Sequence, residues 1–153
     1  MARGAADSGV IRIHEEDINS PGWFNWVWKQ EGWHGYDKVR LEAFLRLAKP
    51  TDQICDVGAG WCGIVQYAGL RAKSSVALDF SAEALRRTRE TSKGTVDCVL
   101  GNALCMPFRS ASFDSVFSGE LIEHMERPRE LIDEMARICR PGGVVAISTV
   151  DTK

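Results

Sequence analysis

The stretch from Gln53 to Ile64 constrains the fold of this chain more than any other, because it joins a short strand-like segment to a helix through a glycine-rich turn. The turn contains Gly58, Gly60 and Gly63. Glycine adopts the unusual dihedral angles of such a turn and leaves room for a ligand to approach the backbone. A strand that turns through glycines into a helix N-terminus also brings free backbone N–H groups close to a ligand. The stretch therefore predicts a site for a nucleotide-type cofactor.

Strand-like and helix-like segments alternate along the chain. Apolar segments typical of buried strands cover residues 53–56, 75–79, 96–100, 112–118 and 144–148. A helical spacing of apolar residues precedes the first of them at Leu41, Phe44, Leu45 and Ala48. Ser81 is a predicted N-cap for a helix to about Thr91, and Pro128 suits the first turn of another. This order predicts an α/β fold: a doubly wound, mostly parallel, Rossmann-like sheet with helices on both faces.

Two classes of cofactor fit the glycine turn. Gly58-x-Gly60-x-x-Gly63 is the dinucleotide fingerprint, and Asp79 follows about 20 residues later at the end of a predicted strand. A carboxylate there accepts hydrogen bonds from vicinal ribose hydroxyls, which both classes of cofactor possess. Asp56 departs from the dinucleotide pattern, in which an apolar residue usually finishes the strand. An NAD-dependent oxidoreductase is therefore kept as the less favoured alternative.

Five motifs in sequence make residues 37–150 resemble a Rossmann-like (class I) S-adenosylmethionine-dependent methyltransferase. In chain order they are Asp56-x-Gly-x-Gly, Leu78-Asp-Phe-Ser, Gly101-Asn-Ala with a later Pro-Phe, Ser112-Phe-Asp-Ser-Val, and Arg140-Pro-Gly-Gly. The resemblance implies S-adenosylmethionine as cofactor and methyl transfer to a small-molecule acceptor, with oxygen as the expected acceptor atom. Cys62 stands where the family often has a third glycine, and we expect this small residue to be tolerated.

The resemblance also implies which residues bind the cofactor. The expected set is Asp56, Gly58, Ala59, Gly60, Asp79, Phe80, Asn102, Ala103 and Ser118. By resemblance, Asp56 holds the methionine ammonium group and Ser118 lies at the methionine end. Asn102 matches the position that addresses the adenine amino group, usually Asp in the family, and an amide carbonyl accepts the same hydrogen bond. The backbone of Ala103 would read the adenine ring, with Phe80, Leu104 and Met106 beside it.

Glu120, Glu123 and His124 form a second candidate group. Residues at i, i+3 and i+4 share one face of a helix or helical turn, so this spacing gathers two carboxylates and an imidazole after the fourth predicted strand. The pattern, with Ser148-Thr149, is similar to ubiquinone-pathway O-methyltransferases and small-RNA 2′-O-methyltransferases. There the group binds a divalent metal such as magnesium (Mg2+), which lowers the pKa of the acceptor hydroxyl. His124 and Glu120 are thus the expected catalytic residues. A structural, metal-free role for His124 remains the alternative.

Charge, apolar runs and cysteine spacing limit which partners, location and thiol state we expect. A net charge of −2 gives no electrostatic reason to expect nucleic acid. No apolar run approaches the length of a membrane span, and the N-terminal residues lack the apolar core of a signal peptide, so a cytoplasmic location is expected. The five cysteines form no C-x-x-C pair, which predicts reduced thiols.

Residues 1–20 are polar and aperiodic, which predicts a flexible arm before a cofactor-binding domain over 21–153.

The sequence ends at Lys153, whereas the family fold usually continues with two more strands. A sheet without them would expose residues 144–148 as an apolar edge, open to a homo-oligomer or a partner chain. Three alternatives stay open: a fragment of a longer protein, a shortened form, or a domain completed by a partner. A chain that binds the cofactor without turnover is therefore a second functional hypothesis.

Overall fold

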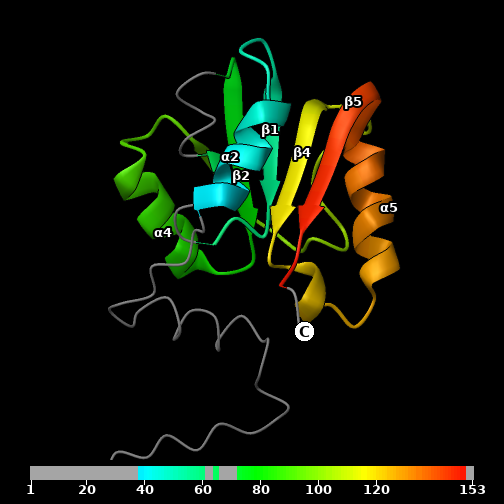
Figure 1. Cartoon of the computed structure of the whole chain (residues 1–153). Coiled ribbons are helices and arrows are strands. Elements are labelled where there is room, and N and C mark those ends of the chain that lie inside the picture. The colour runs from blue at the N-terminus through cyan, green and yellow to red at the C-terminus, as the bar shows by residue number, and fades with distance from the viewer. Residues whose placement is uncertain (1–37, 61–63, 66–71, 151–153) are drawn as a thin grey trace, which may run out of the picture.

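The computed structural model describes residues 38–60, 64–65 and 72–150, which form a five-stranded parallel sheet with helices on both faces (Figure 1). The strands are β1 (Gln53–Val57), β2 (Ser74–Asp79), β3 (Asp97–Leu100), β4 (Phe113–Gly119) and β5 (Cys139–Ser148). Their order is β3-β2-β1-β4-β5, and every neighbouring pair is parallel. The predicted doubly wound fold is confirmed. The strand order reverses between β1 and β4, so their carboxyl ends mark the expected binding crevice.

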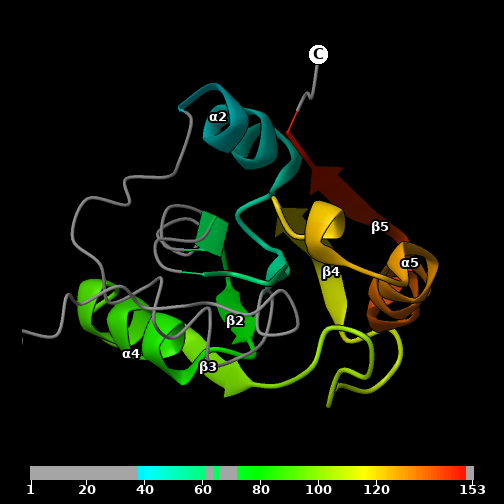
Figure 2. The same ribbon diagram turned by 90° about the horizontal axis from the view of Figure 1, so that it is seen from below.

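Two apolar layers cover the sheet, one on each face. The helices are α2 (Lys38–Leu47), α4 (Ala82–Thr91), α5 (Pro128–Ile138) and the short 3-10 helix η2 (Ile122–His124). Phe44 of α2 and Leu85 of α4 belong to one buried cluster, together with Ile64 and Val65. Leu131, Met135 and Ile138 of α5 belong to the other. Figure 2 shows α2 and α4 on one side of the sheet and α5 on the opposite side.

Two helix starts follow the rules that their sequences suggest. Ser81 precedes α4, and its hydroxyl accepts a hydrogen bond from Ala84 N at 3.2 Å, as expected of an N-cap serine. Pro128 stands at the first turn of α5, where its missing N–H costs no helical hydrogen bond. Both predicted helix starts are confirmed. The cap at Ser81 places the N-terminus of α4 directly after the carboxyl end of β2.

The fifth strand begins earlier than the sequence predicts. The expected strand covered residues 144–148, whereas β5 begins at Cys139. Cys139 pairs with Phe113, and the next pair joins Val144 to Ser115, so the intervening residues bulge out of the ladder. Gly142 has a φ of +80° in this bulge. The Arg-Pro-Gly-Gly sequence, which predicts a turn before the strand, is thus an irregularity between two paired segments.

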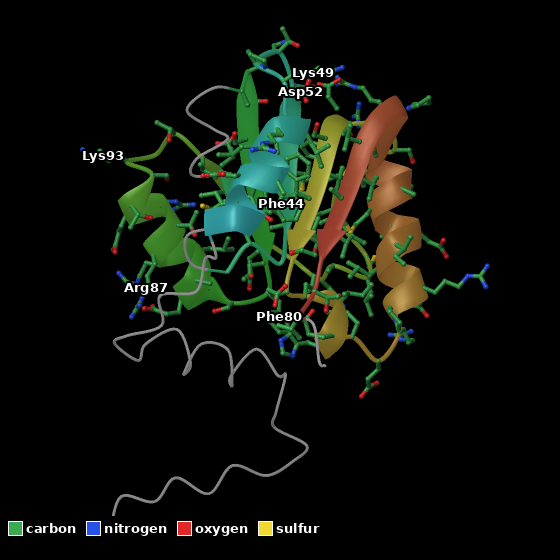
Figure 3. All side chains as sticks on the ribbon, viewed as in Figure 1. Phe44, Lys49, Asp52, Phe80, Arg87 and Lys93 are labelled. Atoms are coloured by element: carbon green, nitrogen blue, oxygen red, sulfur yellow. The ribbon has the colours of Figure 1, made fainter. Side chains whose placement is uncertain are left out.

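The amino ends of the strands are held together by a polar network. The Arg140 guanidinium donates to Asp114 Oδ1 at 2.7 Å and to the side-chain oxygen of Gln53. Gln53 N donates to the other Asp114 oxygen at 2.8 Å. Buried Asp52 accepts from Ser115 Oγ at 2.7 Å. These bonds join β1, β4 and β5 at the end of the sheet away from Phe80, as the labelled Asp52 and Phe80 show (Figure 3).

Several expectations concern residues outside the described ranges. The N-terminal arm, Cys62, Gly63 and the residues after Val150 lie there. Within the described ranges, Cys55, Cys98, Cys105 and Cys139 are free thiols, as predicted for these four. β5 forms one edge of the described sheet, and Val145 on it is exposed. None of the helices in the described part of the chain has the length and apolar character to cross a membrane.

Candidate cofactor site

The glycine turn follows β1 directly and adopts the conformation that glycine permits. Gly58 has a φ of +68° and Gly60 a φ of +57°. A Cβ on Gly58 would lie 2.7 Å from Leu121 Cδ2, so a side chain there would also displace a neighbour. Positive φ is unfavourable for other L-residues. The turn therefore requires glycine for two separate reasons at Gly58.

The backbone N–H groups of Gly58, Ala59 and Gly60 are bonded within the fold, which corrects the expectation of free N–H groups for this part of the turn. Gly58 N and Ala59 N donate to Leu78 O at 2.8 and 3.1 Å, and Gly60 N donates to Asp79 Oδ2 at 2.8 Å. The turn thus continues the contact between β1 and β2 beyond the ends of the strands. We infer that these glycines serve close approach of a ligand rather than donation to an anion.

Asp56 is the fully buried acid at the end of β1. Its Oδ2 accepts a long hydrogen bond of 3.5 Å from Val65 N. Oδ1 is also buried, and no group in the described ranges donates to it. Burial, with a smaller contribution from the neighbouring Asp79 carboxylate, raises the pKa of Asp56 from 3.8 to about 7, although the backbone N–H groups of Val65 and Ile64 oppose the shift. A buried carboxylate oxygen without a donor is costly, and a cationic ligand would relieve that cost.

Asp79 ends β2 and is tied to the surrounding backbone. Its Oδ1 accepts from Ser81 N at 2.7 Å, while its Oδ2 accepts from Gly60 N. Burial raises the pKa of Asp79, and these N–H donors oppose the rise. The backbone N–H of Phe80 is a third donor to this carboxylate, so a ribose hydroxyl would bond to a lone pair that these three donors leave. Asp79 therefore joins the glycine turn to the start of α4 while retaining capacity for a ligand.

The loop after β3 carries the residues expected near adenine. Gly101 N donates to Asp79 O at 2.9 Å, which anchors the loop beside the predicted ribose position. Asn102 is exposed, and its Oδ1 accepts from Leu104 N at 2.8 Å. Ala103 is buried. The Asn102 side chain is thus held in a turn, with one lone pair and its amide hydrogens available to a ligand.

Ser118 and Phe80 lie at the same carboxyl end of the sheet. Ser118 is fully buried on β4, and its hydroxyl donates to Val57 O at 2.9 Å. The hydroxyl proton is therefore used within the fold, and its oxygen remains an acceptor. Phe80 follows β2 directly and is half-buried; Figure 3 shows it at the end of the sheet where the arrows finish.

Glu120, Glu123 and His124 do not share one face of a helix, so the spacing argument behind the metal prediction does not hold. Glu120 has a φ of +55° directly after β4, and only residues 122–124 form a helical turn. The i, i+3, i+4 rule needs a continuous helix, so it does not apply to Glu120. Glu123 is instead bonded to Thr149 Oγ1 at 3.1 Å. Among the side chains that the structure describes, no three acids, histidines or cysteines are grouped as metal ligands. These residues do not fit a magnesium site.

The geometry at the carboxyl ends of β1, β2 and β4 agrees with a match to a known family. Residues 55–147 match the model of the methyltransferase domain family. The chain belongs to this family. Its members are class I S-adenosylmethionine-dependent methyltransferases, and their cofactor fits the site because the ammonium group of the methionine suits the buried Asp56 oxygen.

Individual relatives of the methyltransferase domain differ in the atom they methylate. A malonyl-[acyl-carrier protein] O-methyltransferase of Methylococcus capsulatus is 32% identical over 114 residues, covering 71% of this chain and 41% of the relative. A 24-methylenesterol C-methyltransferase 2 of Oryza sativa subsp. japonica is 32% identical over 108 residues, covering 67% and 30%. The chain thus spans less than half the length of these relatives. Because both relatives are methyltransferases, the match does not support the alternative of an NAD-dependent oxidoreductase.

A solved structure agrees with the fold of the methyltransferase domain. The BH2331 protein of Bacillus halodurans C-125 has a TM-score of 0.66 and 25% identity, covering 74% of this chain and 50% of that one. The Rossmann-like assignment is therefore supported by sequence and by shape.

Two residues of the methyltransferase site were missed by sequence reasoning. Thr88 is fully buried in α4, and its hydroxyl donates to Gly60 O at 3.1 Å, which fixes the glycine turn from the side. Leu121 packs against Gly58 from the segment after β4. The sequence carries a weak signal for Thr88, a polar residue on the helix face that also holds Leu85. It carries none for Leu121.

Proposed function

We propose that the chain is an S-adenosylmethionine-dependent methyltransferase that acts on an oxygen of a small-molecule acceptor. The observation that supports this most is the buried Asp56, with one oxygen that receives no donor from the described residues. An isolated carboxylate in this position is unfavourable, and the ammonium group of a methionine moiety is a cation of suitable chemistry. Asp79 lies at the end of the neighbouring strand, where a ribose would follow.

When bound, S-adenosylmethionine would supply an electrophilic methyl group to the acceptor oxygen, and the electron pair of the broken carbon–sulfur bond would remain on the sulfur. The residues of the chain hold the reacting groups in line and exclude water. His124 and Glu120 follow β4, the strand beside β1, and we propose that they receive the proton of the acceptor hydroxyl. No step through a metal is proposed, because the acidic side chains here do not gather as ligands.

Calorimetric titration with S-adenosylmethionine and, separately, with NADH tests this function. We expect S-adenosylmethionine to bind and NADH to give no heat of binding. A chain that bound NADH alone would refute the methyltransferase assignment. Asp56→Asn should weaken the binding of S-adenosylmethionine at least tenfold, because the ammonium group loses a charged partner.

A second candidate is a chain that binds the cofactor without turnover. The observation behind it is that the match spans less than half the length of the relatives. A panel of phenols, catechols, carboxylic acids and amines, assayed with radiolabelled S-adenosylmethionine, separates the two. Turnover of an oxygen acceptor would remove this second candidate, whereas tight binding with no product on any acceptor would favour it.

The exposed edge of β5 is the proposed contact for another β-strand, from a second copy or from a different chain. Val145 on this strand is exposed and apolar, and an open strand edge readily pairs with further strands. Sedimentation of the purified chain tests self-association. The cytoplasmic location remains a prediction from the sequence.

A further inference from the structure

Two side chains of α5 contact the loop that precedes β4. Glu134 and Arg137 lie one helical turn apart and face residues 106–108. Arg137 Nε donates to Glu134 Oε1 at 2.6 Å, and Arg137 Nη2 donates to Glu134 Oε2 at 2.8 Å. The guanidinium plane and the carboxylate plane thus pair through two parallel bonds, the most directional ion pair that side chains form. The Arg137 guanidinium lowers the pKa of the Glu134 carboxyl below its ordinary value, so the pair remains charged at neutral pH.

This pair binds the loop backbone on both its donor and acceptor groups. Glu134 Oε2 accepts from Met106 N at 2.8 Å. Arg137 Nη2 donates to Met106 O at 3.1 Å, and Nη1 donates to Phe108 O at 2.7 Å. Pro107 lies between them and has no N–H to satisfy. An isolated bridge joins Asn102 to Cys105 earlier in the loop. At residues 106–108 the pair acts together with apolar contacts, since Met106 is buried and the Phe108 ring meets Phe113 edge-on at 5.0 Å.

The loop that the pair holds is the one expected to contact adenine. Met106 directly follows a turn that is closed by two hydrogen bonds. In this turn Cys105 N donates to Asn102 O at 3.1 Å, and Leu104 N donates to Asn102 Oδ1. The other end of this turn is fixed where Gly101 N bonds to Asp79 O. A segment fixed at both ends keeps its backbone in one conformation before a ligand arrives, which reduces the ordering cost of binding.

We propose that Glu134 and Arg137 are positioning residues for the recognition of the adenine ring, acting through the backbone of Met106 and Phe108. The inference rests on the proposed function, because it assumes that residues 102–106 contact the adenine. Neither side chain touches the cofactor in this account. Their effect is on how sharply the loop distinguishes one purine edge from another.

The variant Arg137→Met tests the inference, because it keeps most of the apolar stem and removes every donor to the loop. Arg129→Met is the matched control: it lies on the same helix, its side chain is 94% exposed, and its ion pair with Asp133 spans 3.9 Å. Arg137→Lys is the milder second variant. It keeps the charge but cannot make the two parallel bonds and also reach both carbonyl oxygens.

Three measurements are made on wild type and on each variant. Calorimetry gives the affinity for S-adenosylhomocysteine and for S-inosylhomocysteine, in which a carbonyl replaces the adenine amino group. Hydrogen exchange gives the protection of the Met106 amide without ligand. Urea unfolding confirms that each variant is folded. For Arg137→Met we expect about tenfold weaker binding of S-adenosylhomocysteine, a similar fall in its preference over the inosyl compound, and faster exchange at Met106. Arg137→Lys should change the affinity, the purine preference and the Met106 exchange rate in the same directions, but by less. Arg129→Met should change none of these three quantities.

Three negative results have different meanings. If wild type binds S-adenosylhomocysteine, and folded Arg137→Met or Arg137→Lys binds it equally well with the same purine preference, the inference is wrong and the proposed function stands. If wild type binds neither compound, the proposed function fails and the inference with it. A loss of stability that left the preference unchanged would assign the pair a purely structural role and would also overturn the inference.

Discussion

The replacement of Asp56 by asparagine is the most informative perturbation of the candidate cofactor site. In the folded chain the pKa of Asp56 is raised from 3.8 to about 7 by burial and by the nearby Asp79 charge. An acid whose pKa is raised by folding binds its proton more tightly in the folded state, so its ionisation disfavours folding. Since one pKa unit corresponds to 1.36 kcal/mol, a rise of about three units costs the ionised folded chain about 4 kcal/mol.

The pH dependence follows from the same two pKa values. The stability contributed by the Asp56 proton is present below pH 3.8 and is lost as pH rises to about 7. Of the total, about 2.5 kcal/mol is lost between pH 5 and pH 8. Asp56→Asn has nearly the same shape and no proton to lose. Relative to wild type, this variant should therefore gain about 2.5 kcal/mol of unfolding free energy between pH 5 and pH 8.

Urea unfolding followed by fluorescence at both pH values measures this difference. The difference in unfolding free energy between variant and wild type is compared at the two pH values. Titration of the groups that both chains share cancels in this difference. Asp133→Asn is the control, because its side chain is 73% exposed and should change the unfolding free energy by less than about 0.5 kcal/mol at either pH. The reasoning is wrong if the difference in unfolding free energy between Asp56→Asn and wild type is the same at pH 5 and at pH 8. Such a result would show that Asp56 ionises without the cost inferred from its burial.

Three further tests, with four substitutions between them, concern other parts of the fold. Gly142→Ala should lower the free energy of unfolding by about 1 kcal/mol, because its φ of +80° strains alanine although the space around it is open. Gly143→Ala should lower it by more than about 3 kcal/mol, because its Cβ would lie 2.6 Å from Asp114 O. Urea unfolding of the two variants compares backbone strain with a steric clash. Gly58→Ala should lower both stability, by about 1–2 kcal/mol, and S-adenosylhomocysteine affinity measured by calorimetry, because Leu121 must move. Arg140→Met should cost about 2–3 kcal/mol in urea unfolding and leave cofactor affinity unchanged, because its network lies at the opposite end of the sheet.

Each of these three has a result that would contradict it. Equal losses for Gly142→Ala and Gly143→Ala would mean that the bulge rearranges freely around an added methyl group. Unchanged affinity in Gly58→Ala would separate the turn from the cofactor. A strong loss of affinity in Arg140→Met would show that the two ends of the sheet are coupled.

Features set by local sequence were predicted well. The cap at Ser81, the proline at the start of α5 and the carboxylate of Asp79 at the end of β2 all follow from neighbouring residues and are present. The doubly wound, parallel arrangement was predicted because alternating strands and helices with right-handed connections leave few arrangements. The sequence motif also led to Asp56, although its burial comes from the whole domain.

Features that depend on distant contacts were not predicted. The spacing of Glu120, Glu123 and His124 suggests one helical face, but strand β4 continues to Gly119 and Glu120 turns with positive φ. Local spacing carries no information about where a strand stops. Glu134 and Arg137 likewise have the spacing of an ordinary surface ion pair. Their contact with residues 106–108, some 29 positions away, exists only once the sheet has formed.

The bonds of Asp79 bear on how the cofactor preference of such a domain can change by mutation. The acid predicted to bind ribose also holds Gly60 N and Ser81 N, so any replacement that suits another sugar would loosen the turn and the start of α4 together. A lineage or a designer that sought a different nucleoside would meet the penalty at that position before any benefit. Asn102 has no comparable burden, because it is exposed and bonds only within its own turn. Variation in the base should therefore be reachable by single substitutions, whereas variation in the sugar should need compensating changes in the surrounding backbone.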